Sequence, residues 1–182
     1  IPGQQGGPHM HTIAAIAVAL AEADTEEFIL YAKQILKNAK RLAERLMGYG
    51  FNVVSGGTDT HLILIDLRNL NLPGKKVAKA LDRARIVVNF NGVPGDTAPP
   101  INPSGIRIGT PAITTRGMRE DDMDIIASFI KRVADNVDNE AEIEKVGREV
   151  LLLSSQYPVP DHFIIPTRKN TPFIDKTRTE MN

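Results

Sequence analysis

The feature that most constrains the fold is a helical pattern that runs through residues 10–47. Its second half carries one continuous apolar stripe with alternating steps of four and three residues, which is typical of an amphipathic helix. The stripe consists of Phe28, Ala32, Ile35, Ala39, Leu42 and Leu46. Asp24 stands three residues before Glu27, a spacing that predicts a helix start with Asp24 as N-cap. We therefore expect two helices, or one bent helix with a joint near Asp24.

The first half of this pattern differs from the second because residues 13–21 are apolar on nearly every side. A helix of this kind is buried on several sides or packs against something that the chain itself lacks. The pattern predicts an association with a further domain or with a second subunit.

Beyond Gly50 the pattern changes to short β-rich segments that alternate with helices. Strands are expected over residues 51–55, 61–66, 86–89 and 106–108, and helices over residues 74–84, 119–137 and 141–155. This order predicts an α+β fold, in which a long connecting helix is followed by a small antiparallel or mixed sheet of about four strands with helices on one face. We expect three parts: residues 1–50, a small domain over residues 51–156, and an extended or disordered tail over residues 157–182.

Composition excludes several classes of protein. The 182 residues include no cysteine, so disulfide scaffolds, thiolate metal sites and cysteine nucleophiles are ruled out. The 22 basic residues balance the 22 acidic ones, which argues against a nucleic-acid partner. No apolar run is long enough to span a membrane, and no secretory signal is visible, so we expect a cytoplasmic protein without a membrane partner. His9 and His11 are two residues apart and do not share a helix face, so we expect no metal site.

The chain begins with Ile1 inside a glycine-rich segment, and we therefore expect a piece of a longer protein. Gly6 and Gly7 precede the first helix, where backbone amides and the helix dipole can hold a phosphate. The alternative is a plain glycine turn, which the local pattern favours on its own.

Arg107 lies in a short strand between Gly105 and Gly109, which permit close approach of another group. Its guanidinium suits a carboxylate, although an outward-facing strand arginine is the simpler interpretation. Asn89, Asn91 and Asp96 lie in or beside a long polar loop, where they could bind a heterocycle or only shape turns. The residues alone therefore indicate a small-molecule or anion-binding α+β domain.

Four segments, in this order along the chain, resemble the C-terminal part of serine hydroxymethyltransferase. They are residues 2–11 (PGQQGGPHMH), 54–62 (VSGGTDTHL), 88–94 (VNFNGVP) and 104–117 (SGIRIGTPAITTRG). The resemblance covers residues 2–137. It implies a pyridoxal 5'-phosphate enzyme of the fold-type I class that interconverts serine and glycine, with tetrahydrofolate as co-substrate. Residues 1–50 would then be the end of the large cofactor domain and the connecting helix.

The resemblance also implies roles for individual residues. Arg107 matches the arginine that holds the substrate carboxylate, and Gly6 and Gly7 match the glycines that bind the cofactor phosphate of a neighbouring subunit. The residues matched to the folate side are Asn91, Pro99, Pro100 and Ile101. The family usually has a side-chain hydroxyl near Pro99, and this chain has none there.

One residue that the resemblance calls for, the cofactor-linking lysine, is absent from this chain. The family's cofactor-linking lysine follows a histidine in a threonine-rich string, and the chain contains no such string. We therefore expect the chain alone to be inactive and to need the upstream large domain of the same enzyme, in a homodimer or tetramer that takes amino-acid and folate substrates. The alternative is a non-catalytic small-molecule-binding or assembly domain with the same fold.

Overall fold

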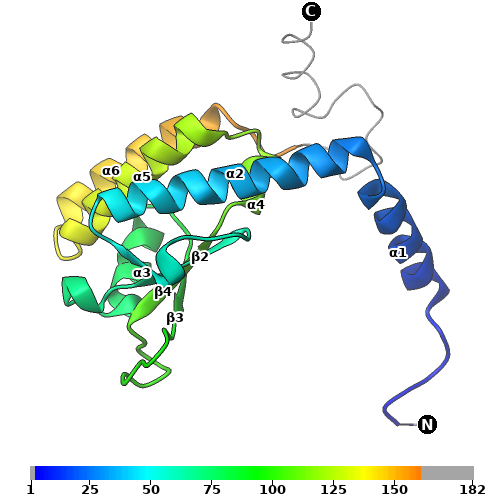
Figure 1. Cartoon of the computed structure of the whole chain (residues 1–182), viewed down its shortest axis with the longest axis horizontal. Coiled ribbons are helices and arrows are strands. Elements are labelled where there is room, and N and C mark those ends of the chain that lie inside the picture. The colour runs from blue at the N-terminus through cyan, green and yellow to red at the C-terminus, as the bar shows by residue number, and fades with distance from the viewer. Residues whose placement is uncertain (1–2, 161–182) are drawn as a thin grey trace, which may run out of the picture.

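The computed structural model describes residues 3–160 and begins with two consecutive helices. α1 spans Met10–Ala23 and α2 spans Glu26–Gly48, so the predicted joint near Asp24 is confirmed (Figure 1). The predicted cap is wrong by one residue. Thr25 is the N-cap of α2, and its Oγ1 accepts a hydrogen bond from the Phe28 amide at 3.2 Å. Asp24 instead closes α1, with its amide bonded to the Leu20 carbonyl.

The sheet has four antiparallel strands within residues 3–160, in the order β1-β2-β4-β3. They are β1 (Asn52–Val53), β2 (Leu62–Asp66), β3 (Asn89–Asn91) and β4 (Gly105–Gly109). The remaining elements are η1 (Val54–Gly56), η2 (Arg68–Leu70), α3 (Gly74–Arg83), α4 (Pro111–Thr115), α5 (Glu120–Asp135) and α6 (Glu140–Ser155). The predicted α+β class is therefore confirmed.

Two of the predicted strands are displaced or shortened. The apolar run that begins at Ile86 was expected to be a strand, but pairing with β4 begins only at Asn89. Arg85 has a left-handed φ of 64°, and Val87 is 83% exposed. The residues from Ile86 to Val88 therefore connect α3 to β3 without belonging to the sheet. The segment expected as a strand over residues 51–55 pairs only through β1, because η1 turns the chain away immediately afterwards.

The core lies between the sheet and the helices. Side chains alternate between the two faces of a strand, and Ile63, Ile65, Ile106 and Ile108 all point to the same buried face. α2 and α3 contact the sheet, α5 packs against both of these helices, and α6 packs against α3 and α5. Tyr157, which was expected to begin the tail, is fixed to this body by a 2.8 Å hydrogen bond from its hydroxyl to Asp122. The rest of the expected tail, from residue 161 onward, lies outside the described residues.

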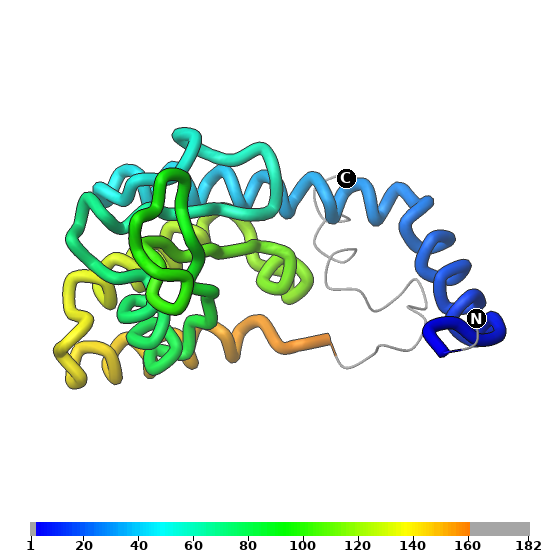
Figure 2. Tube along the Cα trace, turned by 90° about the horizontal axis from the view of Figure 1, so that it is seen from below, coloured from blue at the N-terminus to red at the C-terminus, as the bar shows by residue number. Residues whose placement is uncertain are grey.

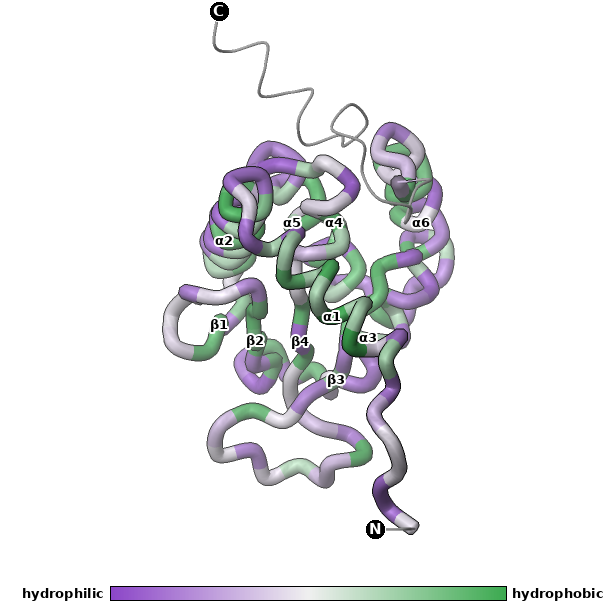
Figure 3. Tube along the Cα trace, turned by 90° about the vertical axis from the view of Figure 1, so that its right-hand side faces the viewer, coloured by the Kyte–Doolittle hydropathy of each residue, from purple (hydrophilic) through white to green (hydrophobic). Residues whose placement is uncertain are grey.

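α1 projects from one end of this body (Figures 1 and 2) and has no buried residue. Figure 3 looks at that end and shows α1 in front of the domain, coloured apolar along much of its length. Its large exposed apolar side chains are Met10, Ile13, Ile16, Val18 and Leu20. Within residues 3–160, no helix is both long enough and apolar enough to cross a membrane.

A buried polar network fastens α2 to the domain. Asn38 is fully buried, and its Nδ2 donates to the Thr114 Oγ1 and to the Met118 carbonyl, both at 2.9 Å. Gln34 Nε2 donates to the Asn38 Oδ1 at 2.9 Å and to the Glu120 carboxylate at 2.8 Å. The network thereby ties the middle of α2 to α4, to the start of α5 and to the segment between them.

Two glycines allow the β4 strand to lie close to its neighbours. A Cβ at Gly74 would stand 2.2 Å from the Gly105 carbonyl oxygen. A Cβ at Gly105 would stand 2.4 Å from the Val93 Cγ1 and 2.7 Å from the Ile65 carbonyl oxygen. Real Cβ atoms do not approach other atoms so closely, so both positions require glycine.

The first prediction concerns the network at Asn38. Asn38→Ala leaves the Met118 carbonyl without its donor in a buried place, so we expect the free energy of unfolding to fall by about 2 kcal/mol. Urea unfolding of the chain measures this change. Lys37→Ala, an exposed neighbour on α2, serves as the control and should change stability by less than about 0.5 kcal/mol. Equal stability of the two variants would contradict the role given to Asn38.

The second prediction concerns Gly105. Gly105→Ala forces Val93 or the backbone of β2 to move, so we expect a loss of about 3 kcal/mol in the free energy of unfolding. Gly48→Ala is the matched control, since nothing lies within 4 Å of a Cβ at that helical position. The control should be neutral or stabilising by up to about 1 kcal/mol. Urea midpoints that move equally in both variants would refute the close approach described for β4.

Candidate functional site

The candidate site is built on the sheet face that points away from the buried isoleucines. Because Ile106 and Ile108 point into the core, Arg107 between them must point to the opposite face. Leu64 of β2 and Asn89 of β3 are its direct cross-strand partners, and directly opposed residues share a face. Leu64, Asn89, Asn91 and Arg107 define this surface, which we call the open face.

Arg107 is the principal charged side chain of the open face. Its side chain is exposed, and within residues 3–160 its guanidinium makes no hydrogen bond or ion pair. Gly105 and Gly109 flank it in β4, and of these Gly105 is buried while Gly109 is exposed. An unpaired guanidinium with its planar fork accessible is suited to bidentate binding of a carboxylate.

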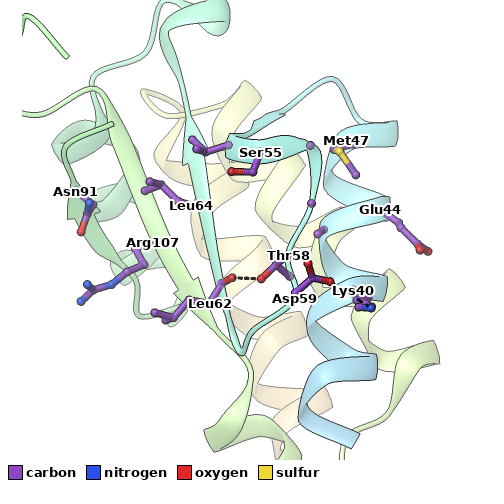
Figure 4. Close-up of a pocket in the computed structure, with 14 residues that line it drawn as sticks. Lys40, Glu44, Met47, Ser55, Thr58, Asp59, Leu62, Leu64, Asn91 and Arg107 are labelled. Atoms are coloured by element: carbon purple, nitrogen blue, oxygen red, sulfur yellow. Dashed lines mark hydrogen bonds and ion pairs between the residues drawn. The ribbon is translucent and has the colours of Figure 1, made fainter. Parts of the chain in front are cut away.

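A cleft of about 740 Å³ opens beside Arg107. Figure 4 shows Arg107 and Asn91 on one side of this cleft and Lys40 and Glu44 of α2 on the other. The turn over residues 54–59 closes a further side. In that turn the Thr58 hydroxyl donates to the Leu62 carbonyl at 2.6 Å, so the turn is held against the start of β2.

The turn over residues 54–59 has an unusual backbone. Ser55, Gly56 and Gly57 are successive residues with positive φ, at 67°, 68° and 152°. Glycine adopts such angles without strain, which explains the presence of Gly56 and Gly57, whereas Ser55 takes the left-handed conformation as a residue with a side chain. Lys40 Nζ lies 3.5 Å from the Asp59 carboxylate across the cleft mouth.

Sequence reasoning did not identify this side of the cleft. The Gly56-Gly57 pair is typical of a turn, and nothing in the sequence shows that α2 lies beside it. The lining residues that were missed include Lys40, Glu44, Ser55, Thr58 and Leu64. Polar and apolar residues do not alternate along β2, because residues 62–65 are all apolar, so the pattern could not separate Leu64 from the core residues Ile63 and Ile65.

The structure brings together only part of the predicted site. Asn91 lines the same cleft as Arg107, and its Nδ2 donates to the neighbouring Gly92 carbonyl at 2.7 Å. The residues predicted for the folate side, Pro99, Pro100 and Ile101, are exposed on the loop between β3 and β4, and they do not line this cleft.

This loop, which we call the β3–β4 loop (residues 92–104), is organised around Asp96. The Asp96 carboxylate accepts hydrogen bonds from the Ser104 amide at 2.9 Å and from the Ala98 amide at 3.0 Å. It also accepts from the Ser104 hydroxyl at 2.8 Å and from the Val93 amide at 3.3 Å. These donors, the Ser104 amide first, hold the pKa of Asp96 well below its usual range.

Gly6 and Gly7 lie in the exposed segment that leads into α1. A Cβ at either position would have nothing within 4 Å, so an anion can reach this backbone freely. In Figures 1 and 2 this segment and the β3–β4 loop lie at opposite ends of the molecule. A single chain therefore does not bring Gly6 and Gly7 to Arg107.

Within residues 3–160, no group of three or more histidine, aspartate or glutamate side chains is placed to hold a metal ion. The polar groups beside the cleft include the guanidinium of Arg107, the amide of Asn91 and the turn opposite them.

The sequence of the chain is similar to those of known proteins. The family model described as serine hydroxymethyltransferase matches residues 1–130. The chain is 50% identical over 159 residues to a serine hydroxymethyltransferase of Sorangium cellulosum, covering 87% of this chain and 38% of that protein. A serine hydroxymethyltransferase of Desulfotalea psychrophila is also 50% identical over 159 residues, with 37% of its length covered. The chain thus spans well under half the length of these curated relatives. With a family match over most of its residues and this identity to two family members, the chain belongs to the serine hydroxymethyltransferase family.

Proposed function

We propose that this chain forms the C-terminal part of an enzyme that moves a one-carbon unit between serine and tetrahydrofolate. The observation that carries the proposal is the placement of Arg107. It is exposed at the cleft on the open face and is unpaired within the described residues, in a chain 50% identical to two serine hydroxymethyltransferases. In this proposal Arg107 holds the carboxylate of the amino-acid substrate. A bidentate grip fixes the substituents of the substrate α-carbon, which favours cleavage of one chosen bond.

The cofactor of the proposed enzyme is pyridoxal 5'-phosphate, and the structure supports one part of a site for it. The segment with Gly6 and Gly7 combines an open backbone with the N-terminus of the 14-residue helix α1, an arrangement suited to a phosphate. When bound, pyridoxal phosphate supplies an electron sink for cleavage at the substrate α-carbon. Because Gly6 and Gly7 lie far from Arg107 in one chain, they would serve the site of a second subunit.

The folate side of the proposed site would be formed by Asn91 together with the β3–β4 loop. Asn91 faces the cleft beside Arg107, and Pro99, Pro100 and Ile101 supply an exposed apolar tip. An amide can form hydrogen bonds with a heterocycle, and apolar side chains can pack against its ring. Tetrahydrofolate would therefore approach from the side of the β3–β4 loop, while the amino acid contacts Arg107.

The rest of the active site would come from an upstream large domain. The chain has no lysine after a histidine, which the cofactor linkage in this family calls for. α1 offers its exposed apolar side chains as the surface on which that domain or a second subunit would pack. We propose that the complete protein is a cytoplasmic homodimer or tetramer.

The third prediction tests Arg107 in a chimera in which this chain replaces the matching segment of the Sorangium cellulosum relative. We expect Arg107→Ala to lower kcat/KM for serine by about 100-fold or more, because the substrate carboxylate loses its charged partner. Arg107→Lys should recover only part of this loss, because the ammonium lacks the bidentate fork. Arg148→Ala, an exposed change on α6, is the control and should leave kcat/KM unchanged. Serine cleavage as fast in Arg107→Ala as in the unmodified chimera would refute the proposed role.

The fourth prediction concerns the incomplete active site. The chain alone, mixed with pyridoxal phosphate, should show no serine cleavage and no absorbance of a lysine-linked cofactor. Addition of the upstream segment of the Sorangium cellulosum relative should restore both signals. A stable cofactor–lysine linkage mapped to this chain by mass spectrometry would contradict the proposal. Failure of the mixture to gain activity would favour the alternative of a non-catalytic binding or assembly domain.

A further inference from the structure

The β3–β4 loop is not a free connection but folds back onto the open face beside the candidate site. Gly105 lies on this face, directly opposite both Asp66 and Asn91 in the sheet. Val93 is buried and packs onto Gly105 in the space that a side chain there would fill. Val93, two residues after Asn91, therefore covers a position that is two residues before Arg107.

Asp96 holds this fold-back in place at both ends of the loop. Its carboxylate bonds to the Val93 amide, near the first end, and to the amide and hydroxyl of Ser104, at the last residue of the loop. Ser104 immediately precedes Gly105. One carboxylate thus connects the segment that follows Asn91 to the segment that leads to Arg107.

A second clamp acts on the same loop from β2. The buried Asp66 carboxylate accepts bonds from Arg68 Nε at 3.0 Å and from Arg68 Nη2 at 2.7 Å. The oriented guanidinium donates in turn to the Gly95 carbonyl at 2.9 Å and to the Pro94 carbonyl at 3.1 Å. The two residues that directly precede Asp96 are therefore held by their carbonyl groups, which restricts the orientation in which the Asp96 carboxylate meets its donors.

We propose that Asp96 is a positioning residue that sets the placement of Asn91 relative to Arg107 by holding the β3–β4 loop folded over Gly105. This inference rests on the proposed function, in which Asn91 and Arg107 serve two different substrates. Asp96 itself contacts neither substrate. It fixes the distance between the group that binds the folate and the group that binds the amino-acid carboxylate. A displacement of about 1 Å between such groups can lower the rate about 100-fold.

The first part of the test uses the 182-residue chain and needs no cofactor. In ¹H–¹⁵N NMR spectra of Asp96→Ala we expect faster amide hydrogen exchange in residues 93–104 by about tenfold or more. We also expect shifted signals for the Asn91 side-chain amide and the Arg107 Nε–H. Signals of α5 and α6 should not change, which shows that the fold persists. Asp96→Asn, whose single oxygen can keep part of the bonds, should give a smaller change of the same kind.

Asp82→Asn is the matched control, because the Asp82 carboxylate is exposed and makes no hydrogen bond or ion pair with the described residues. It should leave every one of these signals in place. Unchanged exchange in residues 93–104, or faster exchange spread equally over the whole chain, would overturn the proposal. If Asp96→Ala does not fold, the milder Asp96→Asn variant decides between these outcomes.

The second part of the test uses the chimera with the Sorangium cellulosum relative. A displaced pair of binding groups should raise KM for serine and for tetrahydrofolate together, with a smaller change in kcat. We expect kcat/KM to fall about 10- to 100-fold in Asp96→Ala and to stay unchanged in Asp82→Asn. Unchanged KM values for both substrates would count against Asp96. An unmodified chimera without activity would count against the proposed function instead, and the spectra of the chain alone would then decide the role of Asp96.

Discussion

The pairing of β2 with β4 is the constraint on which the rest of the structure depends. Its register sets Ile63 opposite Ile108 and Ile65 opposite Ile106, and these four side chains bury the face that α2 and α3 cover. The same register leaves Leu64 and Arg107 on the other face, since neighbouring residues of a strand point in opposite directions. A slip by one residue would bury a guanidinium and expose the isoleucines. The core therefore determines where the candidate site lies.

Much of this arrangement could be predicted because the signals are local. Apolar periodicity located α2, α3, α5 and α6, and the glycines around Arg107 indicated a strand that other groups approach closely. The strand expected to begin at Ile86 was wrong. β-Branched residues favour a strand there, but the partner strand β4 decides the pairing and takes residues 89–91. The far wall of the cleft could not be predicted, because Lys40 and Ser55 are brought together only when α2 packs beside the turn that follows β1.

The residues that would make up the proposed site are distributed over distant parts of the molecule. Arg107 lies on β4, and Asn91 ends β3 where the β3–β4 loop held by Asp96 begins. Gly6 and Gly7 lie beyond the projecting α1. Asn38 fixes α2, which carries both core residues and one wall of the cleft, to the domain. Because the residues of the proposed site lie outside the core, the domain can be well packed although its cleft remains open. In our proposal an upstream domain and a second subunit complete what this chain supplies.

The role of Arg107 can be seen directly in a crystal structure of the active chimera with bound serine or glycine. We expect two guanidinium nitrogens of Arg107 to lie within hydrogen-bond distance of both carboxylate oxygens of the amino acid. We also expect Gly6 and Gly7 of one subunit to face the cofactor phosphate in the other subunit's site. A substrate carboxylate bound by Lys40 or by a residue of the upstream domain, with Arg107 turned to solvent, would refute the role proposed for Arg107.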